Sequence, residues 1–249
     1  MVFFSYILPQ ATISGTVIYA FTTSDWFGRS VVLILVGGSV FAWSIMVSKW
    51  REMQRVMLES NRFLAAYRRE NNPLMVFAQK RRYSGPLASI YHRVCQAVAS
   101  DVATTGESEE LFMSRLMTDD KFRLRQTDFN TACKVAERTT VDQSVILEAN
   151  MGFLATVVTA APFLGLLGTV WGVMDAFRAM AQTGSVMLSE VAPGISGALL
   201  TTVVGLLVAL PSLIGYNLLN GQIQRIDILM ENFAEEFTND LERNFLNVS

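Results

Sequence analysis

The sequence predicts an all-α membrane protein with three transmembrane helices and a large helical cytoplasmic region. Charged residues make up only 17% of its 249 residues and hydrophobic residues 51%, a balance that is unusual for a soluble chain. Three long stretches contain no Asp, Glu, Lys or Arg. Sixteen of the 20 Lys and Arg residues lie in one segment, between the first and the second of these stretches.

Each uncharged stretch is long enough to cross a bilayer as a helix. The stretches cover residues 30–48, 149–174 and 191–224, which are 19, 26 and 34 residues. About 20 apolar residues in a helix cross the roughly 30 Å hydrocarbon core. At about 1.5 Å per residue the third stretch would reach about 51 Å, so we expect it to project beyond the membrane. Helices buried in a soluble core are the alternative, but they seldom run past about 18 residues without a charge.

The N-terminal segment, residues 1–28, begins with 24 residues that also carry no charge. A signal peptide needs a basic region at its start, and these residues contain none. Pro9, Gly15 and several Ser and Thr residues weaken a spanning helix here. We therefore expect an interfacial or short extracytoplasmic helix ahead of Asp25.

The basic residues predict which side of the membrane each segment faces. Lys49, Arg51 and Arg55 stand directly after the first span, and the positive-inside rule places such residues in the cytoplasm. The N-terminus is then outside and the C-terminus cytoplasmic. The predicted segments after the N-terminal one are a first span at 29–49, a cytoplasmic helical domain at 50–148, a second span at 149–174, an outer loop at 175–190, a third span with its extension at 191–224, and a cytoplasmic C-terminal helix at 225–249.

The pattern within the cytoplasmic segments predicts helices. Residues 50–70 carry apolar side chains at helical spacing, which indicates a continuation of the first spanning helix. No proline occurs between Ser108 and Pro162, which predicts one long helix rising into the second span. The C-terminal helix alternates apolar residues with acids, and its apolar face needs a partner. Two partners remain open, namely the cytoplasmic helices of the same chain and another subunit.

Composition argues against several classes of function. The two cysteines, Cys95 and Cys133, and the one histidine, His92, provide neither a disulfide framework nor a zinc ligand set. A net charge of −2 gives no electrostatic footprint for nucleic acid. The sequence has no nucleophile–base pair, metal set or phosphate-binding loop, so we expect no enzyme activity, no metal and no cofactor. Membrane lipid is the first partner that this composition predicts.

The second and third spans carry small residues and hydroxyls in a pattern that predicts close helix packing. The second contains APFLGLLGTVWG, residues 161–172, and the third APGISGALLTTVVGLLVALP, residues 192–211. Glycines at such spacing let two backbones approach in lipid, and proline removes a backbone donor. The candidate packing residues are Pro162, Gly165, Gly168, Gly172, Pro193, Gly194, Gly205 and Pro211.

Thr169, Thr201 and Thr202 place hydroxyls inside these two spans, where no ionisable group occurs. A hydroxyl in a membrane helix either bonds back to its own helix or lines a polar path. Both roles remain open from the residues alone. The three threonines are therefore the candidate ion-path residues.

The stretches APFLGLLGTVWGVMDAF and VAPGISGALLTTVVGLLVALPSLIGYN resemble the TolQ/ExbB/MotA family of proton-driven motor subunits in bacterial inner membranes. LILVGGSVFAWSIMVSKW and ENFAEEFTNDLER lean toward the TolQ branch, with ExbB next. The resemblance implies a homopentameric ring around a central pore. It also implies a TolR-like or ExbD-like single-span dimer in that pore, which supplies a membrane aspartate, and a TolA-like or TonB-like protein beyond it.

The resemblance assigns roles to single residues. Thr169 and Thr202 match the family's pore-lining threonines, whereas Thr201 stands where alanine is common. Gly197 in APGISGAL departs from the family pattern APGIAEAL, which has a glutamate there. The implied function is mechanical coupling of ion flow to the cell envelope for a TolQ-like protein, or to outer-membrane uptake for an ExbB-like one. A non-motor membrane scaffold, in which Gly and Thr only pack helices, is the rival.

Overall fold

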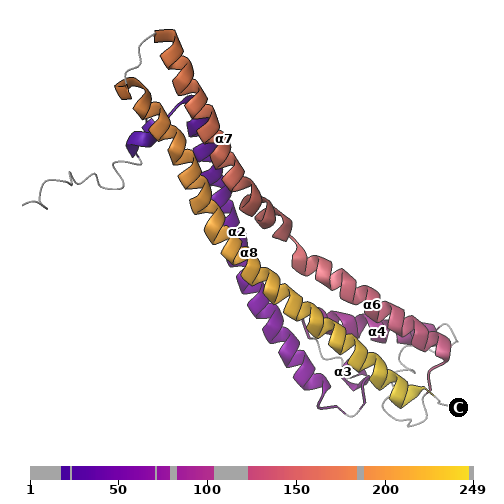
Figure 1. The fold of residues 1–249 in the computed structure, drawn as a ribbon. Helices are drawn as coiled ribbons and strands as arrows, with labels where there is room; N and C mark the ends of the chain where they lie inside the picture. Colours follow the sequence, from indigo (N-terminus) through magenta and orange to yellow (C-terminus); the bar gives the residue numbers. More distant parts are fainter. Residues whose placement is uncertain are drawn as a thin grey trace, which may run out of the picture. The chain divides into compact units, whose positions relative to one another are not determined.

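The computed structural model describes residues 18–22, 24–70, 72–78, 83–103, 123–183 and 188–246 (Figure 1). These residues form helices and connecting turns, and no strand occurs among them. The helices are α2 (Trp26–Tyr67), α3 (Met75–Ala78), α4 (Pro86–Ala103), α6 (Gln126–Glu148), α7 (Met151–Thr183) and α8 (Leu188–Phe245). The all-helical prediction is therefore confirmed for this part of the chain.

The chain divides into two compact units, and the long helices α2 and α8 contribute to both. The first, called the apolar unit here, comprises the chain up to Val47 together with Asn150–Leu218. The second, called the charged unit, comprises Ser48–Ala149 and the chain from Leu219 onward. The expected continuation of the first span into residues 50–70 is present, because α2 runs without interruption to Tyr67.

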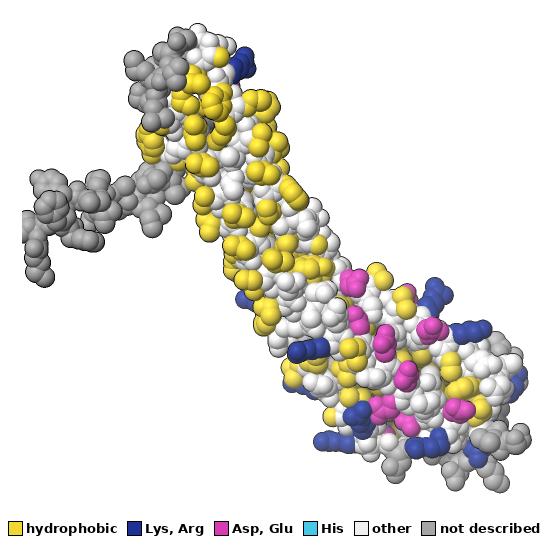
Figure 2. Space-filling view, viewed as in Figure 1, with side chains coloured by type: hydrophobic (Ala, Val, Ile, Leu, Met, Phe, Trp, Pro, Cys, Tyr) yellow, Lys and Arg dark blue, Asp and Glu magenta, His cyan; other side chains and the backbone are white. Residues whose placement is uncertain are grey.

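Three helices are long and apolar enough to cross a membrane, as the sequence predicts. They lie within Trp26–Tyr67, Met151–Gln182 and Val191–Phe245. Large apolar side chains remain on the outside of the apolar unit, and Figure 2 shows them covering the visible face of this part. Lipid tails are as apolar as these side chains, so a bilayer removes the cost that water would impose.

The apolar unit has its own small core, made where the three helices meet. Val31 and Leu35 of α2, Ala161 of α7, and Val208 and Ala209 of α8 are all buried there. Two aromatic pairs join α2 to α7 nearer the surface, where Trp171, Phe41 and Phe153 are 43%, 55% and 40% exposed. The rings of Phe27 and Trp171 lie 4.6 Å apart, and those of Phe41 and Phe153 meet edge to face at 4.8 Å. Such pairs contribute about 0.5–1.5 kcal/mol beyond burial alone.

One predicted feature is wrong, namely one unbroken helix from about Ser108 into the second span; the start of this prediction, up to residue 122, lies outside the described residues. α6 ends at Glu148 and α7 begins at Met151, with Asn150 between them at φ 68°. This left-handed backbone conformation closes a helix, and asparagine tolerates it better than most residues. Pro162 does not interrupt the helix at all, because it lies inside α7. Proline was therefore a poor marker of the break.

An aromatic cluster forms the core of the charged unit. Phe63 and Tyr67 of α2, Tyr91 of α4, and Phe233 and Phe237 of α8 pack with ring centroids 5.0–6.4 Å apart. The apolar face of the C-terminal part of α8 is buried on this cluster and its surroundings, at no more than 1% exposed: Ile226, Met230, Phe233, Phe237 and Leu241. Of the two partners left open for this face, the chain's own helices are the one used.

Polar contacts tie α8 to α2 beside that core. The hydroxyl of Tyr67 donates to the Asp240 carboxylate at 2.8 Å, and burial raises the pKa of Tyr67 above its ordinary value. The Arg68 guanidinium donates twice to Glu236, at 2.9 and 2.7 Å. Bidentate pairs of this kind fix the relative orientation of the two side chains and also contribute stabilisation. They set the register of α8 against α2.

Lys49, the basic residue at the end of the predicted first span, is 4% exposed. Its ammonium donates to the backbone carbonyl of Leu147 at 3.1 Å and pairs with Glu52 at 2.9 Å. A cation at the carboxyl end of a helix complements the partial negative charge of the last carbonyls. Lys49 therefore anchors the end of α6, a role beyond the topological one that the sequence predicts.

Candidate functional site

The candidate site lies in the apolar unit, where α7 and α8 come together through glycines. A Cβ added at Gly165 would stand 2.8 Å from the Thr201 carbonyl oxygen, and one at Gly168 would stand 2.5 Å from the Thr201 hydroxyl. A Cβ at Gly205 would stand 2.7 Å from the Ala161 carbonyl oxygen. Real side chains do not approach other atoms so closely, so the two backbones can meet only because these residues are glycines.

The other predicted packing residues differ in how closely they are packed. A Cβ at Gly172 would meet that of Ala198 at 2.7 Å, whereas one at Gly194 would meet that of Ala176 at 3.4 Å, a normal contact. Pro162 lies inside α7, and Pro193 and Pro211 lie inside α8. Four of the five predicted glycines thus sit in the tight α7–α8 contact, namely Gly165, Gly168, Gly172 and Gly205.

The three candidate threonines meet at this contact, but they are not equivalent. Thr201 is fully buried, and its hydroxyl lies 2.9 Å from the Gly165 carbonyl oxygen and 2.7 Å from that of Ala198. Thr169 and Thr202 are only partly buried, and their hydroxyls hydrogen-bond each other directly. Thr201 therefore serves the helix contact, and the other two hydroxyls form a pair at its margin.

The pair also reaches the same backbone carbonyls. The Thr202 hydroxyl lies 3.1 Å from the Gly165 oxygen, and the Thr169 hydroxyl 3.1 Å from the Ala198 oxygen. Thr169 and Thr201 are 3.4 Å apart, oxygen to oxygen. Each hydroxyl has one proton to donate and two lone pairs that accept. The three hydroxyl protons are thus shared among two carbonyl oxygens and the hydroxyl oxygens themselves. The threonine oxygens therefore keep lone pairs that can accept a further hydrogen bond.

This arrangement suits a carboxyl group supplied from outside the chain. A hydroxyl can accept a hydrogen bond from a protonated carboxyl and can donate one to a carboxylate, so it binds both protonation states. The contacts of the three hydroxyls within the described residues are with carbonyls and with one another. In the same ranges no group of three His, Cys, Asp or Glu side chains could hold a metal ion.

Gly197 lies on α8 one turn before Thr201, and the residues ahead of α2 pack against it. A Cβ at Gly197 would stand 2.5 Å from the Ser24 hydroxyl oxygen and 3.1 Å from the Ala20 carbonyl oxygen. Ser24 is 6% exposed and donates to Ala20 at 2.6 Å. The space that a glutamate would need is thus occupied. The departure at Gly197 is visible in the sequence, but nothing in the sequence pairs Gly197 with Ser24 or Ala20.

The predicted N-terminal helix is described only in its last part. Residues 18–22 are helical, and residues 1–17 lie outside the described residues. Asp25 follows this segment, and burial raises the pKa of its carboxyl, with Asp175 of α7 as a like-charged, hydrogen-bonding neighbour. The Arg29 guanidinium opposes that shift and donates to the Thr22 carbonyl at 2.5 Å. No feature of the sequence predicts that Asp25 and Asp175 are neighbours.

Comparisons with known proteins show which family this sequence resembles. A model of the MotA/TolQ/ExbB proton channel family matches residues 105–232. The Tol-Pal system protein TolQ of Haemophilus influenzae is 28% identical over 220 residues, covering 86% of this chain and 88% of that protein. TolQ of Pseudomonas aeruginosa is 43% identical over 97 residues, covering 39% of this chain and 42% of that protein.

The biopolymer transport protein ExbB of Salmonella typhimurium is 31% identical over 208 residues, covering 80% of this chain and 75% of that protein. The family model spans about half of the chain, including the α7–α8 contact and its threonines. The three apolar helices fit a membrane channel subunit. This chain therefore belongs to the MotA/TolQ/ExbB proton channel family.

Proposed function

We propose that the chain is the ring-forming subunit of a TolQ-like motor in a bacterial inner membrane, driven by the proton-motive force. The observation that carries this is the pair of hydroxyls of Thr169 and Thr202, hydrogen-bonded to each other at the edge of a glycine-packed contact. The pair can hold a carboxyl in either protonation state. The carboxyl itself comes from a TolR-like single-span dimer in the pore.

The proposed mechanism is mechanical coupling. A proton from outside neutralises the partner's aspartate, which then leaves one threonine pair and turns toward the next. Each elementary charge that crosses releases about 2.3 kcal/mol per 100 mV. This exceeds the roughly 0.5–1.5 kcal/mol of a neutral hydrogen bond, so one proton can drive the exchange of one such bond for another. Five copies of this chain form the ring that supplies successive sites.

The output of the motor passes through the partner to the periplasm, where a TolA-like protein carries it to the envelope. This requires the N-terminus to be periplasmic and the C-terminus cytoplasmic, as the basic residues predict. The similarity to Haemophilus influenzae TolQ along most of both chains favours the Tol-like output. An ExbB-like subunit that energises TonB-dependent transport is the second candidate, favoured by the similarity to Salmonella typhimurium ExbB.

A non-motor scaffold is the alternative from another class. Two observations support it: Gly197 stands where the family has a glutamate, and Thr201 packs the two helices together. It predicts no single-span partner and no response to the proton-motive force.

The experiment is the native mass of the complex that this chain forms in its own membrane, extracted in mild detergent. Five copies with two of a single-span, aspartate-bearing protein support the motor, and the identity of that protein separates the Tol-like from the ExbB-like output. A homo-oligomer that lacks such a protein at full yield contradicts the motor and favours the scaffold.

A further inference from the structure

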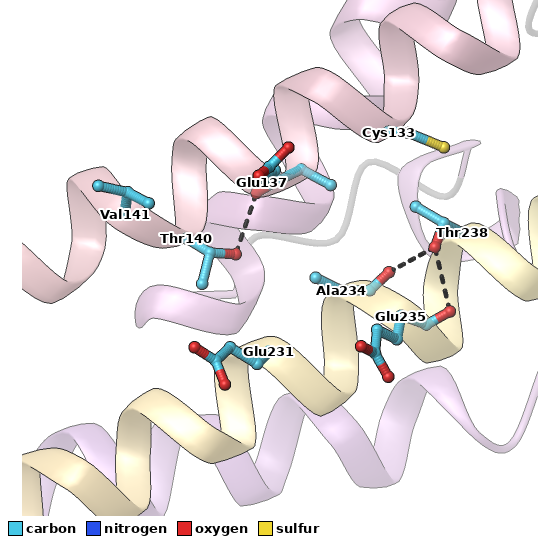
Figure 3. Close-up of a pocket in the computed structure, with 9 residues that line it drawn as sticks. Cys133, Glu137, Thr140, Val141, Glu231, Ala234, Glu235 and Thr238 are labelled. Carbon is cyan, nitrogen blue, oxygen red and sulfur yellow. Dashed lines mark hydrogen bonds between the residues drawn. The ribbon is translucent and has the colours of Figure 1, made fainter.

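The charged unit has a groove of about 410 Å³ between α6 and α8 (Figure 3). Its lining is Cys133, Ala136, Glu137, Thr140 and Val141 of α6 with Glu231, Ala234, Glu235 and Thr238 of α8. The floor is small and apolar, with Ala136 at 2% exposed. At the rim, Val141 is 59% exposed. The groove thus combines apolar surface with a rim of carboxylates.

The three glutamates of this groove are available to a partner. None of Glu137, Glu231 and Glu235 forms an ion pair with another described residue, unlike Glu236, which binds Arg68. Figure 2 shows the Asp and Glu side chains gathered on the visible face of the charged unit, with Lys and Arg mostly around its edges. A docking segment for this groove must therefore be basic and partly apolar.

The same unit carries a helix face with those properties. Along the C-terminal part of α2, residues at alternating spacings of four and three are all exposed, which places them on one stripe: Arg51, Arg55, Leu58, Arg62 and Ala65. Arg69, also exposed, follows in the turn just after the helix ends at Tyr67 and is counted with this face. Leu58 at the middle is 51% exposed. Arg55 pairs with Glu59 at 2.8 Å, whereas Arg62 and Arg69 form no ion pair with other described residues. We call this face the arginine stripe.

We propose that the arginine stripe of one copy of this chain docks in the α6–α8 groove of a second copy. The charges are complementary, and Leu58 and Ala65 match the apolar floor. The two surfaces lie on different helices, so the contact is heterologous, and repeated head-to-tail contacts close into a ring when the rotation permits. The contact deepens the oligomer part of the proposed function and does not depend on any proton-driven step.

A native cysteine in the groove provides a direct test. In the full-length protein in its membrane, Leu58→Cys is treated with a short bis-maleimide at about pH 8.5. Burial and then Glu242 raise the pKa of the Cys133 thiol, so alkaline conditions favour its reaction. The expected result is a ladder of cross-linked oligomers. The same variant with Cys133→Ser must lose the ladder. Monomer alone, from a preparation whose native mass is oligomeric, overturns the contact and leaves the proposed function standing.

Charge reversal supplies a second, independent arm. In the Leu58→Cys background, Arg62→Glu with Arg69→Glu should lower the yield of the ladder by roughly tenfold, because attraction becomes repulsion. Adding Glu231→Arg with Glu235→Arg should restore it. Lys134→Glu with Arg138→Glu, two charge reversals on α6 at exposed residues outside the groove lining, is the matched control and should leave the yield unchanged.

Two further outcomes would count against the proposed contact between copies. If the ladder survives every charge variant, the copies do not meet through this surface. If the ladder never forms but Cys133 is shielded from a monofunctional maleimide by a co-purifying protein, the groove belongs to that protein. Either result overturns docking of a second copy.

Discussion

The hydroxyl of Thr201 on α8 donates to the backbone carbonyl of Gly165 on α7 at 2.9 Å, within a contact too close for any side chain at Gly165. Thr201 is fully buried there, while its neighbour Thr202 faces Thr169 at the margin of the same contact. Two adjacent threonines thus have different surroundings. The hydroxyl of the first is enclosed in the helix contact, whereas the second residue is only partly buried and bonds Thr169 and the Gly165 carbonyl at its margin.

Thr201→Val should lower stability while leaving the hydroxyl pair in place. The change keeps the shape of the side chain and removes one interhelical hydrogen bond, which costs about 0.6–1.7 kcal/mol between membrane helices. The melting temperature of the detergent-solubilised complex measures it. Thr201→Ser, which retains the hydroxyl, is the control and should lose less. A larger loss for Thr201→Ser than for Thr201→Val would show that packing of the methyl group, rather than the hydrogen bond, dominates.

Gly165→Ala should lower the stability of the folded protein more than the addition of one methyl group usually does. The added Cβ would meet backbone atoms of α8 at 2.8 and 3.0 Å, and overpacking typically costs about 1–3 kcal/mol. Gly152→Ala is the matched control on α7, because a Cβ there has nothing within 4 Å. That control should gain about 0.5–1 kcal/mol from reduced backbone entropy. Thermal unfolding in detergent compares the two, and similar melting temperatures would contradict the tight α7–α8 contact.

Gly197→Glu restores the family residue and should displace the segment that packs on it. The new side chain would collide with Ser24 and Ala20, whose atoms lie 2.5–3.1 Å from its Cβ. The measurement is the maleimide labelling rate of Ser24→Cys, which should rise when Gly197→Glu is added. Gly221→Glu, at a site with nothing within 4 Å, should leave the rate unchanged. An unchanged rate in Gly197→Glu would show that the segment does not rely on this glycine.

Asp128 should make the charged unit sensitive to acid. Hydrogen bonds from the Arg125 guanidinium, at 3.0 Å to each oxygen, hold the pKa of this carboxyl below its ordinary value. The unfolded chain then binds more protons than the folded one near that pKa, so the stabilisation is full above about pH 4 and is lost as the pH falls below it. Wild type should melt higher than Asp128→Asn at pH 6. If the difference in melting temperature between wild type and Asp128→Asn does not shrink below pH 4, the ionised Asp128 carboxylate is not the source of the stabilisation.

Much of the fold follows from the sequence, because lipid imposes simple length and composition rules. The three candidate spans, the extension of α2 to Tyr67 and the burial of Phe233 and Phe237 are all foreseeable from uncharged runs and helical spacing. The break at Asn150 is not, since it depends on one left-handed residue rather than on a proline or glycine. Membrane orientation and the exact span limits remain predictions.

The candidate site is only partly foreseeable. Glycine spacing in the second span predicts close packing, but the partner atoms on α8 depend on how the two helices are rotated. Adjacent residues on a helix lie about 100° apart, so Thr201 and Thr202 can take different roles that composition does not separate. The contact of Ser24 with Gly197 joins residues far apart in the chain, and a single sequence has no signal that pairs them.

Proton flux through the intact complex tests the central claim most directly. The wild-type complex and its Thr202→Val variant, reconstituted in vesicles with the partner at equal native mass, are compared under an imposed membrane potential. Loss of a hydrogen bond to a charged group costs about 1.5–3 kcal/mol, so the flux should fall roughly 10- to 100-fold in the variant. An equal flux from both complexes would contradict a site made by Thr169 and Thr202.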